Sequence, residues 1–153
     1  MTRALAAAAL CLLASAARAA DDPVAIARAV GDKFAAACGA GDVKAVLALY
    51  RADARVVYPG AGEMASTPQE LEKMVASTCK KDGPKLELVS YKAVWVDASH
   101  TAIASLGDWS MTAPGADGKP AKTQVRATEV IVKTKKGWRY VVDHASIGVP
   151  PAP

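Results

Sequence analysis

The apolar positions of this chain follow a helical period in its first half and an alternating period in its second half. On the first predicted helix, apolar residues recur every four positions: Ile26, Val30, Phe34 and Cys38. Asp22-Pro23 just before them favours a helix start, because Asp caps free backbone N–H groups and Pro fits the first turn. Gly39 and Gly41 end this helix.

Two shorter helices are predicted after it. Asp42 caps the first, whose apolar face holds Val43, Val46, Leu47 and Tyr50. Residues 67–70 (TPQE) have the form of a capping box and start the second, which ends before Gly83-Pro84. Between these helices, residues 55–58 (RVVY) predict a short strand that stops at Pro59-Gly60.

From residue 85 onward the pattern predicts four long antiparallel strands. The first two cover residues 86–96 and 101–111, and a hairpin with its turn at Lys135-Lys136-Gly137 forms the others. Alternation places Glu129 and Asp143 on one face of this hairpin and His144 on the other. A bulge in the last strand would instead turn His144 to the first face.

This order of elements predicts a single α+β domain. One long sheet has to bury a face, and three amphipathic N-terminal helices are available to cover it. The expected architecture is a cone-shaped, curved antiparallel sheet covered by these helices, with a hollow between them. The predicted division is a leader at residues 1–19, one domain at 20–147 and a proline-rich tail at 148–153.

The first nineteen residues have the composition of a cleavable signal peptide. Arg3 precedes an apolar run at residues 4–14, and Ala17-Arg18-Ala19 predicts cleavage after Ala19. An uncleaved anchor is the alternative, although the run is shorter than a bilayer span. The mature chain is therefore expected to be periplasmic or secreted, without a membrane segment.

Composition narrows the function classes. The formal net charge of +4 falls to +2 once Arg3 and Arg18 leave with the leader, which gives no basis for nucleic-acid binding. Two histidines, on a turn and a distant strand, do not predict a metal site. No nucleotide or dinucleotide fingerprint occurs, so no cofactor is expected. In an oxidising compartment Cys38 and Cys79 are expected to form a disulfide, the alternative being two buried thiols.

Several motifs in order resemble the nuclear-transport-factor-2-like superfamily, in its SnoaL-like and ketosteroid-isomerase-like branch. They are Leu49-Tyr50-x-x-Asp53-Ala54, Arg126-x-Thr128-x-Val130, Lys136-Gly137-Trp138-Arg139 and His144-x-Ser146. The resemblance covers residues 23–147. It implies the cone-shaped fold, a pocket for a small molecule and a homodimer packed through the sheet. It does not fix the chemistry, because the superfamily includes isomerases, cyclases, dehydratases and a kinase association domain.

Two departures from these relatives concern the pocket. Ketosteroid isomerases place an Asp general base where this chain has Tyr58, and a phenol is a poor base at neutral pH. The kinase association domain carries pocket arginines at the places of Glu129 and Ala145. This last match implies that the face of the hairpin bearing Glu129 and Asp143 lines the pocket.

The candidate acid–base residues are Glu129, Asp143 and His144. A carboxylate walled by apolar side chains has a raised pKa, which suits proton transfer. The alternatives are a Glu129 that is exposed or salt-bridged to Arg126 or Arg139, and a structural His144. A second set is expected to line the ligand pocket: Tyr50, Tyr58, Asp108 and Trp109.

Three functions remain open from the sequence. The first is an exported pocketed domain that binds a small, largely apolar molecule. The second is an acid–base enzyme of the isomerase, cyclase or dehydratase kind. The third is a structural or interaction module without a ligand, which would be favoured if Trp95, Trp109 and Trp138 filled the interior.

Overall fold

The computed structural model describes residues 22–59, 62–115 and 117–148 of the chain. The predicted signal peptide, and the predicted tail apart from Gly148, lie outside the described residues. Three helices and five strands follow one another: α2 (Pro23–Ala40), α3 (Val43–Leu47), β1 (Tyr50–Val57), α4 (Pro68–Thr78), β2 (Lys85–Trp95), β3 (Ala102–Pro114), β4 (Pro120–Thr134) and β5 (Gly137–Ile147).

The helix starts are confirmed by their side-chain caps. The Asp22 carboxylate accepts a hydrogen bond from the Val24 backbone N–H, and the Asp42 carboxylate accepts one from Ala45. Thr67 and Glu70 form both halves of the capping box of α4. These bonds satisfy N–H groups that the first helical turn leaves without partners.

The five strands form one curved sheet in the order β1-β5-β4-β3-β2. Strands β2 to β5 pair antiparallel as predicted, but β1 joins the edge of the sheet parallel to β5. The sheet is therefore mixed rather than purely antiparallel. The chain enters β1 at Tyr50, which the sequence pattern had assigned to the preceding helix; there α3 ends at Leu47.

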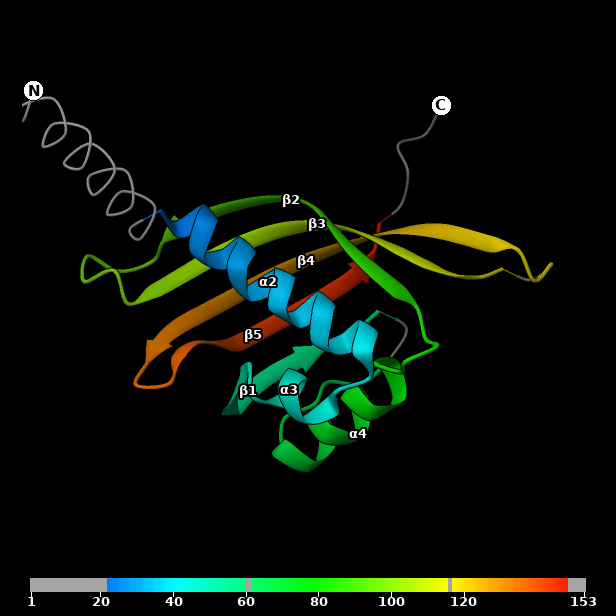
Figure 1. Ribbon diagram of the computed structural model, residues 1–153. Coiled ribbons are helices and arrows are strands. Elements are labelled where there is room, and N and C mark those ends of the chain that lie inside the picture. Colours follow the sequence, from blue (N-terminus) through cyan, green and yellow to red (C-terminus); the bar gives the residue numbers. More distant parts are fainter. Residues whose placement is uncertain (1–21, 60–61, 116, 149–153) are drawn as a thin grey trace, which may run out of the picture.

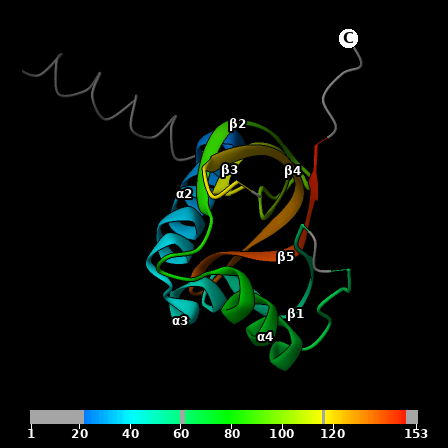
Figure 2. The same ribbon diagram turned by 90° about the vertical axis from the view of Figure 1, so that its right-hand side faces the viewer.

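The helices cover one face of this sheet. Helix α2 lies diagonally across the strands and packs mainly on β2, while α3 and α4 lie near β1 (Figure 1). Seen after a quarter turn, the strands curve over instead of lying in a plane (Figure 2). The core forms between the helices and the concave side, and we call this side the inner face and the opposite side the outer face.

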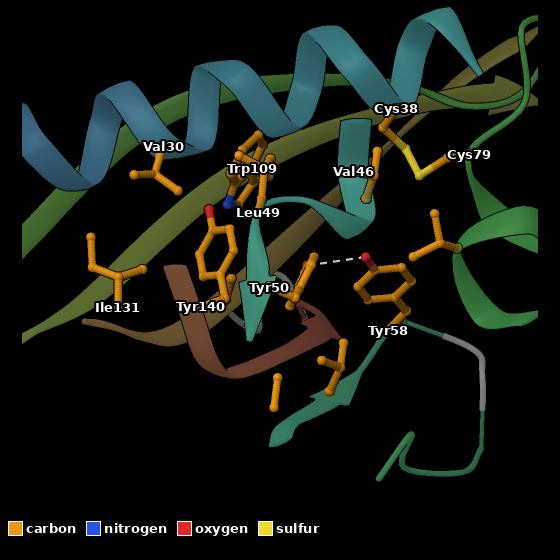
Figure 3. Close-up of a cluster of buried hydrophobic side chains, with 14 of the residues drawn as sticks. Val30, Cys38, Val46, Leu49, Tyr50, Tyr58, Cys79, Trp109, Ile131 and Tyr140 are labelled. Atoms are coloured by element: carbon orange, nitrogen blue, oxygen red, sulfur yellow. Dashed lines mark hydrogen bonds between the residues drawn. A yellow bond between two sulfur atoms is a disulfide. The ribbon is translucent and has the colours of Figure 1, made fainter. Parts of the chain in front are cut away.

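A disulfide joins two of the helices. Cys38 near the end of α2 bonds to Cys79 at the end of α4, with an S–S distance of 2.08 Å (Figure 3). The predicted pairing is thus confirmed in the structure. It holds the two helix ends together on the inner face of the sheet.

Two irregularities in strand pairing change which side chains point inward. The register shifts between Leu88 and Ser90 on β2, and between Val130 and Ile131 on β4, where Val141 of β5 has no direct partner. A bulge adds one residue to a strand and resets its alternation. As a result Leu88 and Tyr91 are both buried, and so are Tyr140 and Asp143.

Candidate functional site

Glu129 and Asp143 lie side by side on the inner face. They are direct partners across β4 and β5, so their side chains leave the sheet next to each other. Their exposed fractions are only 4% and 6%. Two carboxylates buried together are costly unless they are hydrogen-bonded, protonated or paired with a cation.

Hydroxyl groups satisfy both carboxylates. The phenol of Tyr91 and the hydroxyl of Ser105, at 3.0 Å, donate to the same oxygen of Glu129. The phenol of Tyr50 donates to Asp143 over 2.6 Å. Among the described residues, none of the ion pairs includes Glu129 or Asp143. The alternative of a salt bridge from Glu129 to Arg126 or Arg139 is therefore wrong.

The electrostatics of the pair follow from this environment. Burial, and after it the charge of Asp143, raise the pKa of Glu129 to about 7, against the hydrogen bonds from Tyr91 and Ser105. Burial also raises the pKa of Asp143 to about 6, while Tyr50 and His144 act in the opposite direction. The pKa of each carboxyl group is therefore raised toward neutrality.

The phenols remain protonated. Burial is the main cause that raises the pKa of each of them, and nearby carboxylates add to it. All four tyrosines of the chain are involved, and all are buried: Tyr50, Tyr58, Tyr91 and Tyr140. Tyr58 contacts Tyr50 with 3.1 Å between their oxygens (Figure 3). Because Tyr50 also donates to Asp143, a hydrogen-bonded row leads from Asp143 through Tyr50 to Tyr58.

Both carboxylates and Tyr58 line a cavity on the inner face. The cavity has a volume of about 70 Å³, which is room for several water molecules. Its walls are otherwise almost entirely apolar, and they include the rings of Phe34, Trp109 and Tyr140. Phe34 packs edge-on against Tyr58 and against Trp109, with ring centres 6.0 and 6.2 Å apart.

A glycine lets α2 approach the site closely. A Cβ atom on buried Gly31 would lie 3.0 Å from Cε2 of Tyr91 and 3.3 Å from Cη2 of Trp109. Both distances are shorter than ordinary carbon contacts. Helix α2 therefore packs its backbone directly on the ring that donates to Glu129.

The sequence of residues 27–150 matches the model of the SnoaL-like domain. The chain belongs to the SnoaL-like domain family. A comparison with curated protein sequences finds no match. The expectation drawn from the hairpin and Leu49-Tyr50 motifs is thus confirmed.

Solved structures of several different proteins have the same fold as this chain. A candidate calcium/calmodulin-dependent protein kinase II association domain from Xanthomonas campestris is 22% identical, with a TM-score of 0.73 over 86% of this chain and 91% of that one. A ketosteroid isomerase-like protein from Erwinia carotovora atroseptica is 21% identical, with a TM-score of 0.66 over 83% and 97%. Hexachlorocyclohexane dehydrochlorinase LinA-type3 from Novosphingobium barchaimii is 9% identical, with a TM-score of 0.67 over 82% and 86%.

Two candidate site residues of this SnoaL-like domain lie on the outer face, as simple alternation predicted for His144. His144 is exposed there, opposite Thr128. Asp108 is partly exposed, accepts a hydrogen bond from Ser90 over 2.9 Å and lies 3.9 Å from Arg126. Neither residue lines the cavity with Glu129, so the proposed assignment of Asp108 to the pocket has no support from its position.

Three residues of the SnoaL-like site did not emerge from the sequence. Tyr91 and Ser105 hold Glu129, and Tyr140 lines the cavity although simple alternation places it with His144 on the outer face. The bulge at Val141 explains the error, since it turns Tyr140 inward without displacing Asp143. The available signal was the small number of tyrosines, four in the chain.

The tryptophans do not close the interior of the SnoaL-like domain. Trp109 is buried in the cavity wall, whereas Trp95 and Trp138 are half-buried and pack on each other, with ring centres 5.9 Å apart. Trp95 also stacks on His100. These two rings are absent from the cavity lining, which weakens the reading of a filled, ligand-free module.

Two further findings concern the described residues only. No group of three or more His, Cys, Asp or Glu side chains in residues 22–59, 62–115 and 117–148 is placed to hold a metal ion. None of the helices in the same ranges is long and apolar enough to cross a membrane.

Proposed function

We propose that this SnoaL-like domain binds a small, largely apolar molecule in the inner-face cavity. One observation carries the proposal: an apolar cavity opens directly onto two buried carboxylates. Ligand sites combine apolar walls with a few convergent polar groups in this way. The modest volume favours a compact ligand of few heavy atoms over a steroid-sized one.

The binding proposal is tested by filling the cavity. Ala145 lines it from β5, and Ala145→Leu would occupy part of its volume. Ala104→Leu on β3 is the matched control, because residue 104 lies outside the cavity lining. In a thermal-shift screen of small amphiphilic compounds, we expect hits that stabilise the native chain and the control but not Ala145→Leu. Equal shifts in all three proteins would contradict the cavity as the binding place.

A second candidate function is proton transfer by Glu129 and Asp143. The observation in its favour is that both carboxyl pKa values are raised toward neutrality, where a group both accepts and donates protons effectively. Tyr58 adds a protonated phenol at the cavity wall. The dehydrochlorinase among the structural neighbours supports only the compatibility of this fold with an enzyme.

Deuterium exchange tests this second function. A panel of small ketones incubated in D₂O would exchange α-hydrogens faster with the enzyme than without it, as followed by proton NMR. Exchange should fall at least tenfold in Glu129→Gln or Asp143→Asn and remain unchanged in His144→Gln. Exchange that persists when both carboxylates are replaced would refute the assignment.

The outer face supports the expected homodimer. Leu106, at the centre of this face on β3, is 58% exposed, and Val94 on the neighbouring strand β2 is exposed as well. The same face carries Asp108, Arg126 and Lys92, so a second copy related by a two-fold axis would bring opposite charges together around an apolar centre. Light scattering should give twice the monomer mass for the native chain and the monomer mass for Leu106→Lys.

Export is the remaining part of the proposal. The predicted cleavage after Ala19 and the Cys38–Cys79 disulfide together favour an oxidising compartment. Mass spectrometry of the exported chain should show loss of residues 1–19 and a gain of 2 Da on reduction. An intact leader on protein recovered from the cytosol would contradict this localisation.

A further inference from the structure

The polar end of the cavity offers a ligand mainly hydrogen-bond acceptors. The hydroxyl groups of Tyr91 and Ser105 are directed to Glu129, and that of Tyr50 is directed to Asp143. These donors are therefore occupied by the protein's own carboxylates, and the hydroxyl of Tyr58 at the cavity wall is bonded to that of Tyr50. What remains for a ligand at the polar end of the cavity is carboxylate oxygen, which accepts hydrogen bonds and attracts positive charge.

The negative charge of this pair is not balanced by the protein. Among the described residues, every ion pair within 4 Å involves other acids: Asp53, Asp117 and Asp108. His144 lowers the pKa of Asp143, but its side chain is exposed on the outer face of the sheet. A buried charge without a partner is unfavourable, and a ligand of opposite charge would relieve it.

The remaining walls suit the same kind of ligand. The rings of Phe34, Tyr58, Trp109 and Tyr140 border the cavity together with the carboxylates. Aromatic faces attract cations through the ring quadrupole, most strongly when water is excluded. Apolar substituents on a nitrogen would contact these rings, while the nitrogen itself would lie beside Glu129 and Asp143.

We propose that the cavity is a receptor for a small organic cation, an alkylammonium group, held by the Glu129–Asp143 pair and enclosed by the four aromatic rings. This inference rests on the proposed ligand-binding function and specifies its chemical class. An anion would be repelled by the carboxylates. A neutral ligand would leave their charge uncompensated.

Matched probes separate charge from shape. tert-Butylammonium and tert-butanol have the same five-heavy-atom outline, and only the first carries a charge. Tetramethylammonium is charged but has no N–H donor. Titrations of isotope-labelled protein at pH 8, followed by NMR, should give a dissociation constant at least tenfold lower for tert-butylammonium than for tert-butanol. Tetramethylammonium should lie between the two.

Variants then assign the effect to the cavity. Glu129→Gln and Asp143→Asn should each weaken tert-butylammonium binding by about tenfold and leave tert-butanol unchanged, since each removes charge and keeps the shape. Asp108→Asn is the control, because it neutralises a carboxylate of the outer face. Well-dispersed NMR spectra identify the variants that fold. If Glu129→Gln fails to fold, Asp143→Asn carries the comparison alone.

The possible outcomes separate this inference from the binding proposal. Binding of tert-butanol as tightly as tert-butylammonium, lost in Ala145→Leu, would overturn the cation inference and support the cavity. Ammonium binding that Asp108→Asn weakens and Asp143→Asn does not would move the cation to the outer face and overturn the inference. No binding of any probe to the native chain would count against both proposals.

Discussion

Carboxylate side chains on the two faces of the sheet have opposite environments. On the inner face, Glu129 and Asp143 are buried beside each other and have only hydroxyl partners. On the outer face, Asp108 is partly exposed, accepts from Ser90 and has Arg126 nearby. Burial raises the carboxyl pKa values of this inner pair. The capacity of a carboxylate for proton transfer or ligand binding in this protein therefore depends on the face of the sheet to which its side chain points, because that face decides its contact with water.

The largest effect on stability is expected from removing the disulfide that joins the two helices over the inner face. Changing both Cys38 and Cys79 to Ala deletes the bond between α2 and α4. For a bridge spanning 41 positions, the chain-entropy model gives a loss of unfolding free energy of about 4 kcal/mol, as an upper value. Urea unfolding of the variant and of the oxidised native chain measures this loss. A loss below about 1 kcal/mol would mean that packing alone holds the helices.

The next effect concerns pH. Because the pKa of Glu129 rises from 4.5 to about 7 on folding, the folded state retains a proton that the unfolded chain releases between those values. The stability contributed by protonated Glu129 is complete below pH 4.5 and is lost as pH rises through 7. Glu129→Gln removes this dependence, so relative to the native chain it should gain up to about 3 kcal/mol between pH 4.5 and pH 8.

Asp108→Asn is the outer-face counterpart of that experiment. Unfolding free energies from pH 4.5 to pH 8 should follow those of the native chain within about 0.5 kcal/mol. An equal change in slope for both variants would remove the distinction between the two faces.

A smaller effect is expected from single hydroxyl groups. Tyr91→Phe deletes a donor to buried Glu129 and should cost about 2 kcal/mol at pH 8, since hydrogen bonds to charged groups contribute about 1.5–3 kcal/mol. The pKa of Glu129, followed by NMR of its carboxyl carbon, should rise further. Ser90→Ala deletes the donor to Asp108 and should cost less than about 0.5 kcal/mol.

The smallest effect is expected at the outer ion pair. Arg126→Gln removes a contact of 3.9 Å between partly exposed groups. Exposed pairs contribute about 0–1 kcal/mol, and salt screens them. Thermal unfolding at low and high ionic strength should therefore show a small difference that vanishes in salt. A loss above about 2 kcal/mol would show that the outer pair is shielded from water, as in a dimer.

Local signals in the sequence were sufficient for the helices and for one hairpin arm. The helix starts could be predicted from Asp22, Asp42 and Thr67, because capping depends on neighbours within a few residues. The alternation correctly places Glu129 and Asp143 on one face of the hairpin, and the resemblance to the kinase association domain implied that this face points inward. Gly137, with φ of 95°, supplies the expected turn between the last two strands.

Non-local pairing was harder to predict. The parallel addition of β1 to β5 depends on contacts about ninety positions apart, which no short pattern encodes. The bulges at Val89 of β2 and Val141 of β5 lie in stretches that alternate well enough to hide them. Tyr91 and Tyr140 were missed for this reason, and with Tyr91 one of the two hydroxyl donors to Glu129.

The unpaired Val141 has a consequence for how this protein could change. In a strictly alternating strand, residues three apart leave on opposite sides, so Tyr140 and Asp143 share the interior only because Val141 is unpaired. Deletion of the Val141 codon would leave the two residues two positions apart and therefore still on one face. The inward direction of both side chains thus tolerates the loss of this bulge, whereas a slip of pairing that regularised β5 at its present length would separate them.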